Sequence, residues 1–171
     1  MGVQIKTPNR LVTDFLDPAQ TLRWTPVNDR VMGGVSTSQA TATAKGMAFS
    51  GKVSLENNGG FASIRTLPSN YRLAGAVAII LRVQGDGKAY KFGIRTDDAF
   101  DVVQYQMQFT TQSGEWQDIR LPINEFQPTF RGRTVQAPTL DPARIRVFGL
   151  LISDRQAGPF QLVVESIQAQ F

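Results

Sequence analysis

Alternation of apolar and polar side chains is the dominant pattern along this chain. Between residues 47 and 56 the odd positions are apolar or small, and the even positions from Ser50 onward are polar or charged. A period of two places successive side chains on opposite faces of a β-strand. The same period returns at residues 77–83, 90–94 and 103–109. The pattern therefore predicts strands that each bury one face.

Turn-forming residues separate these segments. Asn, Asp, Ser and Gly cluster at residues 57–60, 85–87, 96–98 and 112–114, and such residues tolerate positive φ or bond their own backbone. We interpret these clusters as hairpin turns.

Further strands are predicted at residues 116–121, 145–152 and 160–171. The apolar phase of the last segment shifts near Glu165, which indicates a β-bulge. Residues 11–22 have the pattern of one short helix, and residues 124–142 are interpreted as a long irregular connection.

Regularly spaced strands with little helical periodicity favour an all-β, antiparallel sandwich or barrel. The chain has 171 residues and shows neither an internal repeat nor a linker. That length is enough for one hydrophobic core. We expect an N-terminal tail at residues 1–13 and a single β-sandwich domain at residues 14–171.

Composition removes several kinds of chemistry. The sequence contains no cysteine and no histidine, which excludes disulfides, Ser–His and Cys–His catalysis, and most zinc sites. The candidate carboxylates for glycoside hydrolysis or calcium binding are Glu56, Asp97, Asp98 and Asp101. They match neither a calcium loop nor a defined pair, so we interpret them as surface acids. We expect no enzyme activity, no metal and no cofactor.

The ends and charge of the chain bear on location and partners. Residues 1–12 lack the apolar stretch of a secretory signal, and the longest apolar run, residues 74–81, is too short to span a bilayer. We expect a cytoplasmic or organelle-internal protein with at most peripheral membrane contact. The net charge is +4, but the C-terminal arginines lack interleaved aromatic residues, which disfavours nucleic-acid binding.

Two longer motifs identify a family. They are NDRVMGGVS at residues 28–36 and SLENNGGFASIR at residues 54–65. Shorter matches follow at residues 49–51, 85–87 with Tyr90, Trp116 with residues 121–122, 131–132 and 158–160. Together they resemble the signature of the complex I intermediate-associated protein domain, over residues 14–171. That family includes a mitochondrial assembly factor for NADH:ubiquinone oxidoreductase.

The resemblance implies a jelly-roll sandwich similar to galactose-binding and carbohydrate-binding modules. It also implies a non-catalytic accessory or assembly protein whose partners are protein subunits of a membrane-associated, complex I-like or related electron-transfer complex. The alternative is a carbohydrate- or small-ligand-binding module that uses the polar face of the sandwich.

Two candidate sites lie in the motifs. Asn28, Asp29 and Arg30 precede adjacent glycines and form either a clamp between strands or a contact for a partner. Glu56 and Asn58 lie at an expected hairpin tip, where they serve the turn itself or the recognition of a polar ligand.

The third candidate site is the polar face of the middle strands. If the aromatic residues of these strands point inward, alternation gathers the intervening polar residues on the opposite face. That set consists of Lys91, Arg95, Gln104, Gln106 and Gln108, together with Arg65 from a neighbouring strand. Amide and guanidinium groups on a rigid sheet suit sugars, phosphates or acidic protein loops, and the other interpretation is an ordinary solvated surface.

Overall fold

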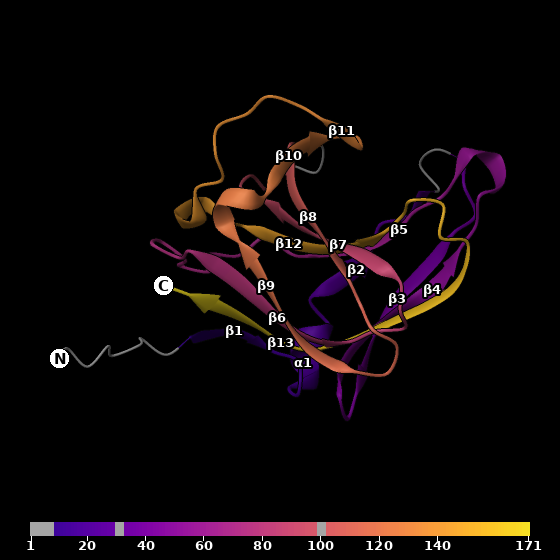
Figure 1. The fold of residues 1–171 in the computed structure, drawn as a ribbon, viewed down its shortest axis with the longest axis horizontal. Helices are drawn as coiled ribbons and strands as arrows, with labels where there is room; N and C mark the ends of the chain where they lie inside the picture. The colour runs from indigo at the N-terminus through magenta and orange to yellow at the C-terminus, as the bar shows by residue number, and fades with distance from the viewer. Residues whose placement is uncertain (1–8, 30–32, 99–101) are drawn as a thin grey trace.

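The computed structural model describes residues 9–29, 33–98 and 102–171, and Figure 1 shows their fold. The strands form two antiparallel sheets that pack against each other. Sheet A has the order β3-β4-β13-β6-β9, with β1 also paired to β13. Its strands are β1 (Arg10–Asp14), β3 (Thr37–Thr43), β4 (Gly46–Val53), β6 (Ala78–Gln84), β9 (Trp116–Pro122) and β13 (Gly158–Gln170).

Sheet B has the order β11-β10-β8-β7-β12-β5-β2. Its strands are β2 (Trp24–Pro26), β5 (Ala62–Thr66), β7 (Ala89–Arg95), β8 (Gln104–Thr110), β10 (Gln127–Phe130), β11 (Arg133–Thr134) and β12 (Val147–Ile152). Short helices lie in the connections: α1 (Pro18–Thr21) and the 3-10 helices η2 (Glu56–Asn58), η3 (Ile123–Glu125) and η4 (Pro142–Arg144). No helix within these described residues has the length and apolar character needed to cross a membrane.

The core lies between the inner faces of the two sheets. Phe49 from sheet A and Tyr90, Phe92 and Phe148 from sheet B are almost completely buried there. The rings of Phe92 and Phe148 lie 5.4 Å apart. Phe49, Tyr90 and Phe92 are inward positions of the alternating pattern. The expected all-β, antiparallel jelly-roll sandwich is confirmed.

The predicted bulge in the last strand is also confirmed. The register between β13 and β6 shifts between Val164 and Ser166, on either side of Glu165. The extra residue changes which face the following side chains occupy. Ile167 and Ala169 therefore remain in the core despite the change of phase.

The prediction of one helix across residues 11–22 was wrong for its first half. Residues Arg10–Asp14 form β1, which pairs with β13, and only the four residues of α1 are helical. Asp17 caps this helix by accepting a hydrogen bond from the Ala19 amide at 3.0 Å. Long-range pairing with β13 overrides the weak local helical pattern. From the sequence we expected residues 10–13 to belong to the N-terminal tail. In the structure they form part of β1 and belong to sheet A.

Three of the four expected hairpin turns instead cross between the sheets. Residues 57–60 link β4 to β5, residues 85–87 link β6 to β7, and residues 112–114 link β8 to β9. Only residues 96–98 belong to the connection between two neighbours in one sheet, β7 and β8. Local turn chemistry reverses the chain, but it does not determine which strand becomes the partner. The region at 124–142, expected to be irregular, contains β10 and β11.

Candidate functional site

The surface of sheet B that faces away from the core carries most of the polar residues singled out from the sequence. We call this surface the outer face. Strand β7 buries Tyr90, Phe92 and Ile94 in the core and directs the intervening residues outward. The strand residues of the outer face include Ser63, Arg65, Lys91, Gly93, Arg95, Gln104, Gln106, Gln108, Gln127, Gly149 and Leu151.

One row of residues crosses the centre of the outer face. It runs from Arg65 on β5 through Gly149 on β12 and Gly93 on β7 to Gln106 on β8. A Cβ atom at Gly93 would lie only 2.0 Å from Nε2 of Gln104, so the Gln104 side chain rests on the backbone of this glycine. Gln106 holds Gln104 there by donating a hydrogen bond from Nε2 to Oε1 at 2.7 Å. The centre of the face is therefore backbone covered by one amide side chain.

The charges on this face are mainly positive. Arg95 is 9% exposed, and Arg65 is half-buried. Burial lowers the pKa of Arg65, but a guanidinium remains protonated in proteins. Lys91 is balanced by Asp154, with Nζ 3.3 Å from Oδ1. Guanidinium and amide groups held on a rigid sheet can bind carboxylates, carbonyls or sugar hydroxyls.

The two long sequence motifs meet at the carboxylate of Asp29. This residue is completely buried. Its oxygens accept hydrogen bonds from the Ser36 amide at 3.0 Å and from Ser36 Oγ at 2.6 Å. They also accept bonds from the amides of Gly60 at 2.8 Å and Phe61 at 3.4 Å. Asp29 thus joins residues 28–36 to residues 54–65, and of the two roles left open by the sequence the structure supports the clamp.

Hydrogen bonding decides the charge state of this buried acid. Burial alone would raise the pKa of Asp29, but the bonds from Ser36, Gly60 and Phe61 outweigh burial and lower it. Glycines allow this close approach, since a Cβ atom at Gly34 would lie 2.3 Å from Cγ of Asp29 and one at Gly59 would lie 2.5 Å from Oδ2. The glycines of the motifs therefore make room for the carboxylate.

Asn28 makes a similar clamp beside Asp29. Its Oδ1 accepts hydrogen bonds from Ser38 Oγ at 2.6 Å and from the Ser63 amide at 3.1 Å. These contacts tie β3 of sheet A to β5 of sheet B at the margin of the outer face. Glu56 is exposed in η2. Arg30 lies outside the described residues, and the structure describes the backbone of Asn58 but not its side chain.

A further motif position, Asp86, also has a structural role. Its Oδ1 accepts a hydrogen bond from the Tyr90 hydroxyl at 3.0 Å, and its Oδ2 accepts one from the Gln161 amide at 2.9 Å. Burial and the charge of Asp86 both raise the pKa of Tyr90. Asp86 therefore links β7 of sheet B to β13 of sheet A.

The acids considered for catalysis do not converge in the described structure. Glu56 precedes β5, at the end of sheet B where β7 begins, whereas Asp97 and Asp98 follow the opposite end of β7. The seven residues of β7 span about 20 Å. Asp98 pairs with Arg146, with Oδ1 2.7 Å from Nε, and this bond lowers the pKa of Asp98. Asp101 lies outside the described residues.

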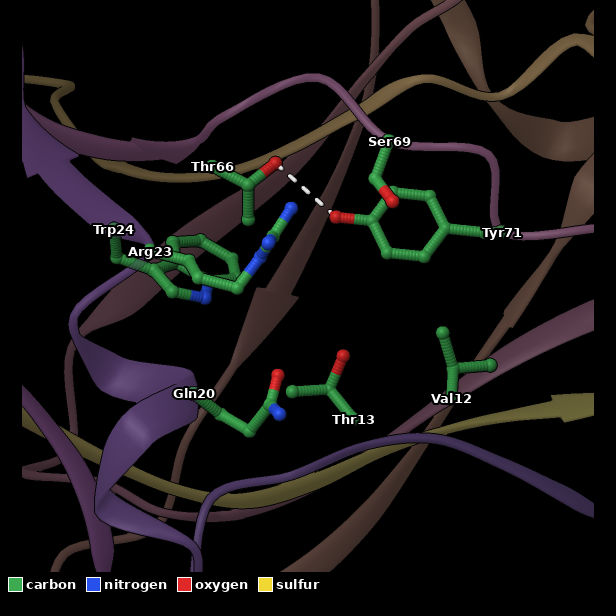
Figure 2. A pocket seen from close by; sticks show the side chains of 8 residues that line it. All are labelled: Val12, Thr13, Gln20, Arg23, Trp24, Thr66, Ser69 and Tyr71. Atoms are coloured by element: carbon green, nitrogen blue, oxygen red, sulfur yellow. Dashed lines mark hydrogen bonds between the residues drawn. The ribbon is translucent and has the colours of Figure 1, made fainter.

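Sequence patterns did not indicate the pocket that Figure 2 shows from close by. Its volume is about 260 Å³, and it is lined by Val12, Thr13, Gln20, Arg23, Trp24, Thr66, Ser69 and Tyr71. These residues come from β1, α1, β2, the end of β5 and the segment that follows β5. No spacing in the sequence connects them, because the fold alone brings these segments together.

Known proteins with similar folds include carbohydrate-binding modules. The family 11 carbohydrate-binding module of Clostridium thermocellum, bound to a mixed-linked tetrasaccharide, has a TM-score of 0.64 and 15% identity, with 95% of each chain covered. An agarase, AgWH50C, has a TM-score of 0.63 and 9% identity, covering 96% of this chain and 25% of the agarase chain. At these identities the likeness shows the fold alone.

Sequence relatives point to one family. An uncharacterized protein of Schizosaccharomyces pombe is 34% identical over 165 residues, covering 84% of this chain and 75% of that protein. Mitochondrial complex I intermediate-associated protein 30 is 26% identical in Neurospora crassa and 24% identical in Drosophila melanogaster, covering 71% and 94% of this chain. The matched regions span 50% and 62% of those two proteins. Residues 13–164 match the family described as Complex I intermediate-associated protein 30 (CIA30), and the chain belongs to this family.

Proposed function

We propose that this domain is a non-catalytic assembly factor that binds protein intermediates of a membrane-associated, NADH dehydrogenase-type complex. The observation that carries this proposal is the CIA30 family match over residues 13–164. Relatives in Neurospora crassa and Drosophila melanogaster are named complex I intermediate-associated proteins. We further propose that the domain reaches its partner from the aqueous side of the membrane.

The outer face of sheet B is the proposed contact surface. Arg65 and the glutamine side chains of β8 present hydrogen-bond donors on a rigid sheet, and the side chain of Gln104 lies over the backbone of Gly93 between them. An incompletely assembled subunit exposes carboxylates and unpaired backbone carbonyls, which such donors bind well. The proposed partner segment is therefore an acidic loop or an extended chain lying across this face.

A carbohydrate is the second candidate ligand, because carbohydrate-binding modules share this fold. Sugar recognition usually uses exposed aromatic rings on which the sugar stacks. The aromatic residues of strands β7, β8 and β12 point into the core, and none of the described strand residues on the outer face is aromatic. This arrangement favours a protein segment over a sugar.

Replacing Arg65 by alanine is expected to reduce the recovery of complex subunits about tenfold, since arginines at the centre of an interface often dominate its binding energy. The tagged full chain is used to capture partners from gently solubilised native membranes, and recovered subunits are quantified by mass spectrometry. Gln106→Ala should reduce recovery as well, because it removes an amide from the same row and frees Gln104.

Arg120→Ala is the matched control, because Arg120 is an exposed arginine on β9 of the opposite sheet. Thermal unfolding of each variant shows whether the fold is retained. Equal recovery by the Arg65 and Arg120 variants would remove the outer face from the proposal. Recovery of only unrelated proteins by the unaltered chain would overturn the assembly role itself.

A further inference from the structure

None of the eight residues that line the pocket of Figure 2 is among the strand residues named for the outer face. Figure 2 shows the guanidinium end of Arg23 directed toward Thr66 and Tyr71, with Thr13 and Gln20 on the other side of the pocket. Hydroxyl, amide and guanidinium groups from separate segments thus converge on one space. Convergent polar groups in a concave site can fix the orientation of a bound ligand.

The pocket carries a single charge. Arg23 is the one charged residue among the eight described residues that line it. Within the described part of the chain, its guanidinium forms neither a hydrogen bond nor an ion pair. The remaining polar lining residues are neutral: Thr13, Gln20, Thr66, Ser69 and Tyr71. The site therefore offers a cation and several neutral hydrogen-bonding groups to a bound molecule.

The walls of the pocket are held by the core. Trp24 and Thr66 are each 5% exposed. Oγ1 of Thr66 accepts hydrogen bonds from the Phe148 amide at 3.1 Å and from the Tyr71 hydroxyl at 3.4 Å. The rings of Tyr71 and Phe148 lie 4.4 Å apart. Because these wall side chains are already held in place, few of them must be immobilised when a ligand enters. This lowers the entropic cost of binding.

We propose that this pocket binds a carboxylate. A guanidinium presents parallel N–H groups that match the two oxygens of a carboxylate, and one such pair balances the single charge. A doubly charged phosphate would leave negative charge uncompensated, because no second cation lines the described pocket. Val12 and Trp24 provide apolar wall for the carbon body of the acid. The volume of about 260 Å³ suits a small acid or the end of a protein chain.

The two tryptophans of this chain make the pocket directly testable. Trp24 lines the pocket, whereas Trp116 lies on β9 with Arg82 over its ring at 5.5 Å. The indole N–H signals of the ¹⁵N-labelled full chain are followed by NMR during titration with propionate or with the uncharged propionamide. We expect propionate to shift the Trp24 signal saturably, and we expect propionamide to leave it unchanged. The Trp116 signal should not respond to either compound.

Arg23→Gln should weaken propionate binding at least about tenfold, because it removes a charge-assisted hydrogen-bond pair. Arg133→Gln, which alters an exposed arginine on β11, should leave binding unchanged. Tyr71→Phe tests the hydroxyl separately, since the phenylalanine ring can keep its packing on Phe148. We expect it to weaken binding by a few fold, and thermal unfolding confirms that each variant is folded.

Peptides with a free or an amidated C-terminus distinguish the two sources of a carboxylate. Tighter binding of the free peptide than of propionate assigns the site to a chain end, and the reverse order assigns it to a small acid. Equal responses to propionate and propionamide would refute the proposal. So would a saturable Trp24 response that Arg23→Gln leaves intact, or no response to propionate and to the free peptide.

Discussion

Replacing Asp29 by alanine is expected to lower the free energy of unfolding by about 3–5 kcal/mol, because buried donors would lose a charged acceptor. The carboxylate accepts hydrogen bonds from the Ser36 amide and hydroxyl and from the Gly60 amide, at 2.6 to 3.0 Å. Asp29 and Ser36 are both completely buried, so water does not readily replace the lost acceptor at Ser36. Urea-induced unfolding, followed by circular dichroism, measures the loss.

An exposed acid serves as the control for this substitution. Asp118 is exposed on β9, where it pairs with Arg82 at 3.2 Å. Asp118→Ala should change the free energy of unfolding by less than about 1 kcal/mol. Similar losses for the two variants would show that the Asp29 clamp contributes nothing special to stability.

The contribution of Asp29 should also depend on pH. The folded state holds the pKa of this carboxyl below its ordinary value of 3.8. Its stabilising contribution is therefore complete above the unfolded-state pKa and is lost as the pH falls through the folded-state pKa. The stability difference between the unaltered chain and Asp29→Asn should accordingly shrink below about pH 4. A difference that stays constant down to pH 2 would argue against a buried, charged Asp29.

Gly34→Ala is expected to destabilise the fold by about 2–4 kcal/mol, the range of overpacked buried sites. The added Cβ would lie 2.3 Å from Cγ of Asp29 and 2.5 Å from its Oδ1. The carboxylate must then move away from Ser36 and Gly60, or the loop must shift and lose the bond from the Gly34 amide to the Asp29 carbonyl at 2.9 Å.

The neighbouring glycine offers a matched comparison. Gly33 has a φ of +84°, but a Cβ atom there would have no atom of the described residues within 4 Å. Gly33→Ala should therefore lower the free energy of unfolding by only about 1 kcal/mol, because alanine disfavours the left-handed backbone conformation. Thermal unfolding of both variants checks that Gly34→Ala loses more stability than Gly33→Ala. A larger loss at Gly33 than at Gly34 would mean that backbone conformation, and not the space beside Asp29, makes these glycines necessary.

The Asp29 clamp bears on which residues determine specificity for a partner. Asp29, Gly34 and Gly59, which belong to the two long sequence motifs, lie in and around a buried hydrogen-bonded junction. A junction of this kind can be shared by proteins with different partners, because it stabilises the loops without contacting anything outside. If the proposed contact surface is correct, differences among partners should arise from the exposed side chains of the outer face.

The amino-acid sequence by itself determined which side chains face inward along the main strands. Alternation at residues 90–94 and 103–109 correctly separated the core aromatic residues from Lys91, Arg95, Gln104 and Gln106. The phase change at Glu165 likewise located the bulge. Both results follow from the period of two in a strand, which is a local property of the chain.

Only the tertiary structure decided which strands are neighbours, and therefore which residues form a site. The turn at residues 57–60 has local hairpin chemistry, yet it crosses from sheet A to sheet B and brings Gly60 to Asp29. The pocket likewise brings together Arg23 and Tyr71, which lie in two segments that no sequence pattern connects. Pairing between distant strands depends on the packing of the whole core, which is why local patterns could not predict either contact.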